Sequence, residues 1–361
     1  MTQRVVEGTE VKHYAPVNYG RRVVRWRVGK LWFKSDLRVV GVCLILAAVG
    51  IAVFLFSLAS GEYRISLPQL MQALTDSTES FTRTVVVEWR MPRALAALAF
   101  GAALGASGAV FQSLTRNPLA SPDIIGFSAG AYSGALLVII VISGNYLQVA
   151  AGALVGGLIT AALVYLLAFK RGVQGFRLII VGIAVSATLS SINTWLLLTT
   201  DLDTAMMAAV WGAGSLNGTT WTQAGVGSLL ALGLLLVILL LAHTLRQLEM
   251  GDDAASALGI RVEPVRLLMM LLSVGLVAVV TAAAGPISFV ALAAPQIARR
   301  VAATAGNSVV PSALMGAVLL AASDYVAQHA LPMMLPVGTV TVVIGGGYMI
   351  WLLVREARKN N

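Results

Sequence analysis

Long apolar segments separated by short polar connections dominate the sequence from residue 38 onward. A helix needs roughly 20 apolar residues to cross a bilayer, and only helices or closed barrels satisfy their backbone hydrogen bonds in lipid. These segments are rich in Leu, Ala, Val and Gly and lack the alternation of a barrel strand. Charged residues make up only 11% of the chain, against about a quarter in a soluble domain. The sequence therefore predicts an all-α polytopic membrane protein.

About ten segments are candidates for transmembrane helices. The eighth is short, with Pro286 just before it and Pro295 inside it, so we leave open whether residues 287–301 cross the membrane fully. The predicted spans are 38–59, 94–114, 124–143, 148–169, 178–199, 224–244, 266–284, 287–301, 309–330 and 336–354.

Lys and Arg residues concentrate in alternate connections, and this sets the expected orientation. With a cytoplasmic N-terminus, ten spans place all 25 basic residues on the cytoplasmic side except Arg64, Arg83, Arg90 and Arg93. Residues 1–37 form a basic arm, which we interpret as a cytoplasmic topology signal beside anionic lipid and not as a nucleic-acid site. We expect a multi-pass protein of the cytoplasmic membrane with both termini inside the cell.

The four exceptional arginines all lie in one outer segment, residues 60–93. A folded outer connection is free to carry charge, and this segment also contains acidic residues. The alternative is an electropositive docking surface for an acidic partner. Arg90 and Arg93 flank Pro92, which suits a first helical turn, at the mouth of the second span.

Motifs for energy conversion are missing from the sequence. Gly29–Lys30 is followed by Leu31 and does not complete a phosphate-binding loop. The sequence has no H-E-x-x-H metal motif, its Ser-rich stretch at 186–191 lacks a G-x-S-x-G nucleophile motif, and Cys43 is its only cysteine. We predict that the chain is not an enzyme and binds no metal or cofactor of its own.

Asp324, in the ninth span, is the best candidate for the ion site of a secondary transporter, which usually has ionisable groups within its spans. A role in helix packing or in a backbone hydrogen bond is the favoured alternative, because polar groups in spans often serve packing.

Residues 246–266 form a polar connection between two strong spans. Asp252 or Asp253 can cap a short helix beginning at Ala254, and Gly259 suits the end of that helix. This pattern fits an ordinary loop, or a lever that a cytoplasmic motor engages.

Several long motifs, in order along the chain, resemble one family. They are RMPRALAAL with GAALGASGAVFQSLTRNPLASPDIIGFSAGA in residues 90–131, EMGDDAASALG at 249–259, AGPISFVALAAPQIARR at 284–300 and LPVGTVT at 335–341. They are similar to the FecCD/BtuC-like permeases of type II ABC importers, which serve siderophores, haem and vitamin B12. The motifs EWRMPR, FRLII, NTWLLL, WGAGSLNG and LEMGDD narrow this similarity to ferric siderophore permeases, with residues 38–358 as the permease domain.

The resemblance implies a membrane permease subunit for iron uptake that carries ferric siderophore, with haem or cobalamin as alternative substrates. An ion-coupled secondary transporter is less favoured. The implied partners are a second permease subunit, most simply in a heterodimer, two cytoplasmic ATPase chains that bind ATP and Mg, and an extracytoplasmic siderophore-binding protein. The resemblance leaves the particular chelate open.

The resemblance also assigns roles to residues. Arg90 and Arg93 match arginines that dock the binding protein, whereas Gln328 replaces a third docking arginine and Gln296 replaces a common histidine. The residues that match the ATPase coupling helices are Glu249, Met250, Gly251, Asp252, Asp253, Ala257, Leu258 and Gly259. The predicted gate or pathway residues are Leu119, Gly175, Phe176, Gln112 and Asn193.

Overall fold

The structure is a computed structural model. It describes residues 4–7, 10–13, 23–28, 31–61, 63–75, 80–123, 126–168, 175–330 and 333–358. The four strands are β1 (Arg4–Glu7), β2 (Glu10–His13), β3 (Val23–Val28) and β4 (Leu31–Asp36). The helices are α1 (Leu37–Ala59), α2 (Leu67–Thr75), α3 (Phe81–Arg83), η1 (Thr84–Arg90), α4 (Met91–Thr115), α5 (Phe127–Leu137), η2 (Val138–Ile142), α6 (Tyr146–Ala168), α7 (Gly175–Thr199), α8 (Leu202–Gly212), α9 (Trp221–Leu240), α10 (Ala242–Glu249), α11 (Asp252–Ala257), α12 (Val262–Ala284), α13 (Val290–Ala302), α14 (Val309–His329) and α15 (Val337–Ala357).

Each of the predicted spans coincides with a helix, and the all-α membrane fold is confirmed. Within the described residues, seven helices are long and apolar enough to cross a membrane, and the shorter helices at 127–142 and 337–351 are also apolar. The helix that contains α4 runs without a break from Phe81 to Thr115, because α3 and the π-helical turns of η1 lead directly into it. Two short helices, α2 and α8, were not predicted.

The remaining predicted span, α13, is a half-length helix. Its 13 residues rise about 20 Å, which is less than the roughly 30 Å of the hydrocarbon core. The chain reaches it through a non-helical turn in which Gly285 and Phe289 both adopt positive φ, at 72° and 68°. Residues 285–287 are buried in protein, which is the setting that allows irregular backbone at membrane depth.

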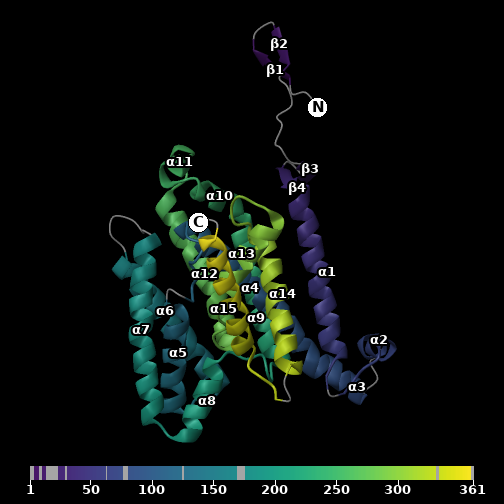
Figure 1. The fold of residues 1–361 in the computed structure, drawn as a ribbon, viewed down its shortest axis with the longest axis vertical. Coiled ribbons are helices and arrows are strands. Elements are labelled where there is room, and N and C mark those ends of the chain that lie inside the picture. The colour runs from purple at the N-terminus through teal and green to yellow at the C-terminus, as the bar shows by residue number, and fades with distance from the viewer. Residues whose placement is uncertain are drawn as a thin grey trace.

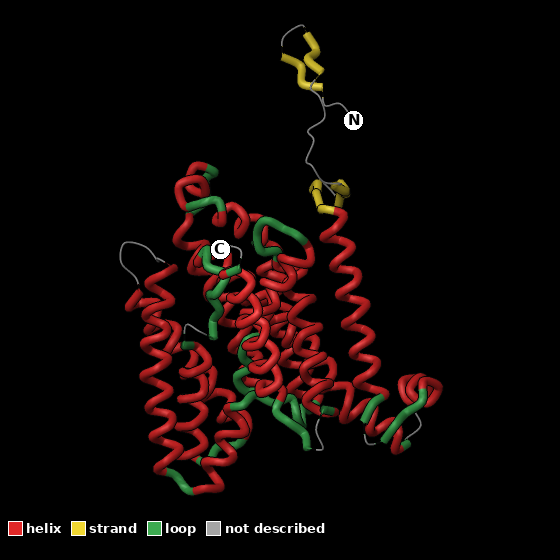
Figure 2. The backbone as a smooth tube through the Cα atoms, in the orientation of Figure 1, coloured by secondary structure: helices red, strands yellow, loops and turns green. Residues whose placement is uncertain are grey.

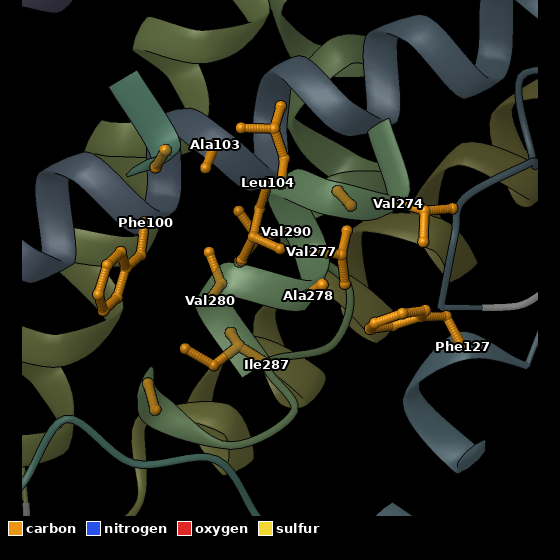
Figure 3. Packing of buried hydrophobic residues seen from close by; sticks show 14 of the residues in the cluster. Phe100, Ala103, Leu104, Phe127, Val274, Val277, Ala278, Val280, Ile287 and Val290 are labelled. Carbon is orange, nitrogen blue, oxygen red and sulfur yellow. The ribbon is translucent and has the colours of Figure 1, made fainter. Parts of the chain in front are cut away.

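Helix α4 forms the centre of the bundle. In the apolar 18-residue stretch of the long helix that contains α4, 78% of the residues are buried, against 17% in the corresponding stretches of α1 and α7. Figure 3 shows its side chains packed with those of neighbouring elements around one core. The labelled members are Phe100, Ala103, Leu104, Phe127, Val274, Val277, Ala278, Val280, Ile287 and Val290.

Small residues let α4 and α14 approach closely. Gly101 and Gly105 are four residues apart on α4 and face Ser312 and Gly316 on α14, so that an added Cβ at either glycine would overlap the α14 backbone. Because the hydrophobic effect does not drive helices together inside lipid, the close van der Waals packing of this small-xxx-small arrangement stabilises the pair. The same pattern joins α5 to α6.

The two ends of the bundle differ. The N-terminal strands, α10, α11 and the end of α15 lie at one end, which we call the basic end, while α2, α3 and α8 lie at the opposite end (Figure 1). The strands form two antiparallel hairpins, β1–β2 and β3–β4, confined to the arm (Figure 2). These hairpins were not predicted. Both ends of the described chain lie at the basic end, which agrees with the predicted even number of crossings.

Candidate functional site

At the opposite end, Arg93 and Asp324 form an ion pair between α4 and α14. Arg93 Nη2 lies 2.8 Å from Asp324 Oδ1, and Arg93 Nε lies 3.0 Å from Oδ2. The side chains are 11% and 3% exposed, so the fork is almost completely removed from solvent. Gln328 Nε2 donates to Asp324 Oδ2 over 2.8 Å. Asp324 therefore joins α14 to α4 through an ion pair, in agreement with the predicted role in helix packing.

Arg90, one helical turn before Arg93, is held by backbone carbonyls. Its Nη1 donates to Leu58 O over 2.8 Å and its Nη2 to Tyr63 O over 2.7 Å. Gly61 has φ of 144° and leaves room for the guanidinium, because a Cβ there would overlap it. The π-helical segment η1 ends at Arg90, and π-helical turns are frequent at functional sites.

Both predicted docking arginines line one cavity of about 810 Å³ at this end. Aromatic side chains and hydroxyls from α1, η1, α9 and their connections share its wall, and the carboxylate of Glu88 lies at it, exposed. Trp221 Nε1 donates to Val87 O over 2.9 Å and so ties α9 to η1. The docking role itself stays a prediction.

At the basic end, the predicted coupling segment, residues 249–259, begins at the last residue of α10 and contains α11. Gly251 and Gly259 bracket α11 with φ of 119° and 83°, conformations that favour glycine. Met250 and Leu258 are 62% and 57% exposed. The free apolar side chains at both ends of a short helix are what a partner's groove would bury.

The other coupling residues divide between solvent and the bundle. Asp253 and Ala257 are exposed. The carboxylate of Glu249 instead accepts a short hydrogen bond from Ser113 Oγ in the last turn of α4. Asp252 Oδ1 accepts from Arg116 Nη2 at 2.6 Å and from Arg266 Nη2 at 2.7 Å.

The pKa of Asp252 is lowered from its ordinary value, chiefly by the hydrogen bond from Arg266 and then by the charges of Arg266 and Arg116. Burial opposes this shift. Asp252 is therefore an ionised group that faces the bundle, although it belongs to the segment predicted to face the ATPase.

The predicted gate residues occupy two kinds of position. Leu119 and Phe176 are 41% and 76% exposed, and Gly175 is the first residue of α7. Gln112 and Asn193 are buried: Gln112 Nε2 donates to Leu292 O over 3.0 Å, and Asn193 Oδ1 accepts from Ser133 Oγ over 2.8 Å. These two amides link helices inside the subunit, and a pathway role for any of the five stays a prediction.

Asp123, in the connection between α4 and α5, was not singled out from the sequence. Burial raises its pKa to about 6, against the smaller opposing effects of hydrogen bonds from Ser128 and from the Phe289 backbone. Ser128 Oγ donates to Oδ1 over 3.2 Å, while Oδ2 is buried without a partner among the described residues. Its neighbour Pro122 fits a loop, and only tertiary packing reveals the burial.

The bundle, its buried central helix and the exposed short helix at the basic end define a polytopic membrane permease. The profile of the FecCD transport family matches residues 20–355. The chain belongs to the FecCD transport family, as its motifs predicted.

Individual relatives agree with this assignment. The ferric enterobactin transport system permease protein FepG of Escherichia coli is 49% identical over 318 residues, covering 88% of this chain and 96% of its own length. The achromobactin transport system permease protein CbrC of Dickeya dadantii is 34% identical, covering 92% and 97%. A solved structure, described as an inward-facing conformation of a metal-chelate type ABC transporter, has a TM-score of 0.78 at 28% identity and covers 87% and 99%. The chain is thus a permease subunit of an ABC transporter and not an ATP-hydrolysing enzyme.

Proposed function

We propose that this chain is a membrane permease subunit of an ATP-driven importer that carries a ferric siderophore across the cytoplasmic membrane. The observation that supports this most strongly is the 49% identity, over nearly the whole of both chains, to a ferric enterobactin permease. Haem and cobalamin are the alternative substrates within the same fold.

The basic end is the cytoplasmic end in this proposal. It carries the N-terminal arm, α10, α11 and the end of α15, and the basic residues outside the 60–93 segment belong to the connections on this side. An importer of this kind needs an ATPase on that side. We assign ATP and Mg to two partner ATPase chains, with the exposed Met250 and Leu258 of the coupling segment as their contact.

The opposite end receives the siderophore-binding protein. The cavity of about 810 Å³ offers the guanidinium of Arg90, and a carboxylate from the binding protein fits such a site through charge-assisted hydrogen bonds. Arg93 is already neutralised by Asp324, so Arg90 is the better candidate for direct docking. The second permease subunit, most simply a different chain, completes the pathway.

An ion-driven secondary transporter is disfavoured by one observation. Its candidate ion site, Asp324, is 3% exposed and holds a bidentate arginine, so its charge is already compensated within the chain. A coupling ion would have to displace Arg93 from a contact of 2.8 Å.

The test is uptake in a strain that lacks this gene, with a panel of radiolabelled ferric siderophores, haem and cobalamin. We expect the deletion to abolish uptake of at least one ferric siderophore, and plasmid-borne expression of the chain to restore it. Restoration is expected to fail with Arg90→Glu, whereas Arg64→Glu, an exposed arginine in the same outer segment, serves as the matched control. Undiminished uptake of every iron chelate in the deletion strain would contradict the proposal.

A further inference from the structure

Helix α11 stands apart from the bundle except on one side. An added Cβ at either bracketing glycine, Gly251 or Gly259, would meet nothing within 4 Å. Ala255 is the buried residue of the helix. A six-residue helix with one small buried side chain gains little from apolar packing, so polar contacts must contribute to its position.

Those polar contacts converge on Asp252. A single oxygen, Oδ1, accepts from Arg116 at 2.6 Å and from Arg266 at 2.7 Å. Arg266 is 8% exposed in α12, and its Nη1 is held by Glu263 at 2.8 Å. The Arg266 end of the contact is therefore fixed to the bundle, whereas Arg116 and Asp252 are each 48% exposed.

Arg116 connects this contact to the end of α4. It is the C-cap of α4 and adopts left-handed φ of 50°. Its Nη2 also donates to Leu248 O, at the end of α10, over 3.1 Å. Three residues later comes Leu119, a predicted gate residue whose backbone N–H is held by Asn117 Oδ1 at 2.9 Å.

The connection that follows α4 rests on α13. Gln296 Nε2 donates to Pro118 O in a short contact, and Gln112 Nε2 donates to Leu292 O over 3.0 Å. A displacement of α11 would thus be transmitted through Asp252 and Arg116 to the 117–120 turn. The turn would then move relative to α13, which contacts its other side.

We propose that Asp252 is a positioning residue that couples movement of α11 to the end of α4 and the 117–120 turn, through its shared contact with Arg116 and Arg266. This rests on the proposed function, since it presumes that an ATPase moves α11. Asp252 acts here by facing inward, and Met250 and Leu258 supply the contact with the ATPase. The carboxylate of Asp252 is charged at neutral pH, and its contacts with the two arginines lower its pKa further.

The experiment uses the complete importer, with its second permease, ATPase and binding protein, in proteoliposomes. Ferric enterobactin uptake and phosphate release are measured together, and the result is the uptake per ATP hydrolysed. Asp252→Asn keeps the side-chain shape, and Arg266 stays paired with Glu263. We expect normal co-purification of the ATPase and a fall in uptake per ATP on the order of tenfold, within the usual range of coupling between sites.

Arg116→Gln carries the same test, and it decides the matter if Asp252→Asn prevents assembly, because it leaves Asp252 bonded to Arg266. The double variant should be no worse than the more severe single variant, as expected for two partners of one contact. Arg261→Gln is the matched control: Arg261 is exposed in the same connection, and the described residues provide no ion pair for it.

Two outcomes would overturn the coupling role. One is uptake per ATP within about twofold of the unaltered importer in the single variants, where a coupling role predicts a loss of at least about fivefold. The other is a double variant whose fold-loss in uptake per ATP equals the product of the two single losses, as independent sites would give. A merely structural contact would lower the yield of the complex and leave this ratio unchanged. Failure of the proposed function looks different, because then the unaltered importer itself takes up no ferric siderophore.

Discussion

The two ends of α4 each have an arginine that meets a carboxylate from a distant part of the chain, but the two contacts differ in burial. Arg93, at the opposite end, is 11% exposed and its partner Asp324 is 3% exposed. Arg116, at the basic end, and its partner Asp252 are both 48% exposed. The first contact joins two long helices, and the second joins α4 to a six-residue helix.

This difference indicates which end is fixed and which is adjustable. Breaking a buried ion pair leaves an uncompensated charge that is largely shielded from solvent, so the Arg93 end of α4 can move only at a high free-energy cost. Solvent can replace either partner of the exposed pair at low cost. The basic end is therefore the end at which α4 can be displaced at the lower free-energy cost.

The largest expected effect is at the fixed end. Arg93→Ala removes the partner of a buried carboxylate, and we expect a loss of about 3–5 kcal/mol in unfolding free energy. The change is measured as denaturant or thermal unfolding of the purified chain in detergent. Replacing both partners, with Arg93→Met and Asp324→Leu, should recover most of the loss. Arg64→Ala is the control, and an equal loss there would contradict the assignment.

The second prediction compares the two buried carboxylates. Asp324 is paired with an arginine, whereas Asp123 has hydroxyl and amide donors. Burial raises the pKa of Asp123 from 3.8 to about 6. The folded state therefore binds the proton more tightly, and stability falls as the pH rises from about 4 to about 6. Asp123→Asn should stabilise the chain above pH 6 by up to about 3 kcal/mol.

The measurement is the melting temperature of the Asp123→Asn variant relative to the unaltered chain between pH 5 and pH 8. The advantage should grow up to about pH 7 and then level off, because the carboxyl is ionised there. Asp203→Asn, at an exposed position, should show no such trend. A variant that is less stable at pH 8 than the unaltered chain would show that the carboxylate has a cation partner.

The third prediction concerns the close contact between α4 and α14, which lies between the two ends of α4. A Cβ at Gly105 would overlap the carbonyl of Ser312, so Gly105→Ala should force the helices apart and cost about 1–3 kcal/mol. Gly225→Ala, on α9, is the matched control because a Cβ there meets nothing within 4 Å. The control should be neutral or stabilising, since Ala is the better helix former. Equal losses in both variants would remove the close-approach argument.

The smallest effect on stability is expected at the adjustable end. Arg116→Gln breaks an exposed ion pair and should change the unfolding free energy by less than about 1 kcal/mol. Unfolding of the variant and of the unaltered chain is compared at low and high salt, and the difference should shrink as salt screens the pair. A loss as large as that of Arg93→Ala would mean that both ends are fixed.

Most of the fold could be predicted from the sequence because lipid imposes a local rule. Each crossing segment must be apolar over many consecutive residues, and the long apolar helices of the described part of the chain follow from that pattern. A short helix that ends before Gly259 was also predicted, but its start was placed at Ala254 with Asp252 or Asp253 as the cap. Helix α11 instead begins at Asp252, and its N-cap is Gly251, which provides no side-chain hydrogen bond. The hairpin β3–β4 had a signal that was not used: before Gly29–Lys30, Arg25 and Arg27 alternate with apolar residues, as in a strand.

The contacts within the site could not be predicted. Arg93 and Asp324 are 231 residues apart, and Arg116 and Asp252 are 136 residues apart, so only the packing of α4 against distant elements brings each pair together. The family resemblance gave Arg93 and Asp252 roles toward partners, but the structure shows that both side chains are engaged within the chain. The burial of Asp123 follows from the α13 turn, which no local pattern reveals.

The most direct test of the account is transport by purified components in proteoliposomes. Vesicles that contain this chain with its proposed partners (a second permease, the ATPase and a binding protein) should accumulate ferric siderophore when ATP is supplied, and vesicles without the ATPase should not. Accumulation by this chain alone, driven by an ion gradient, would contradict the account.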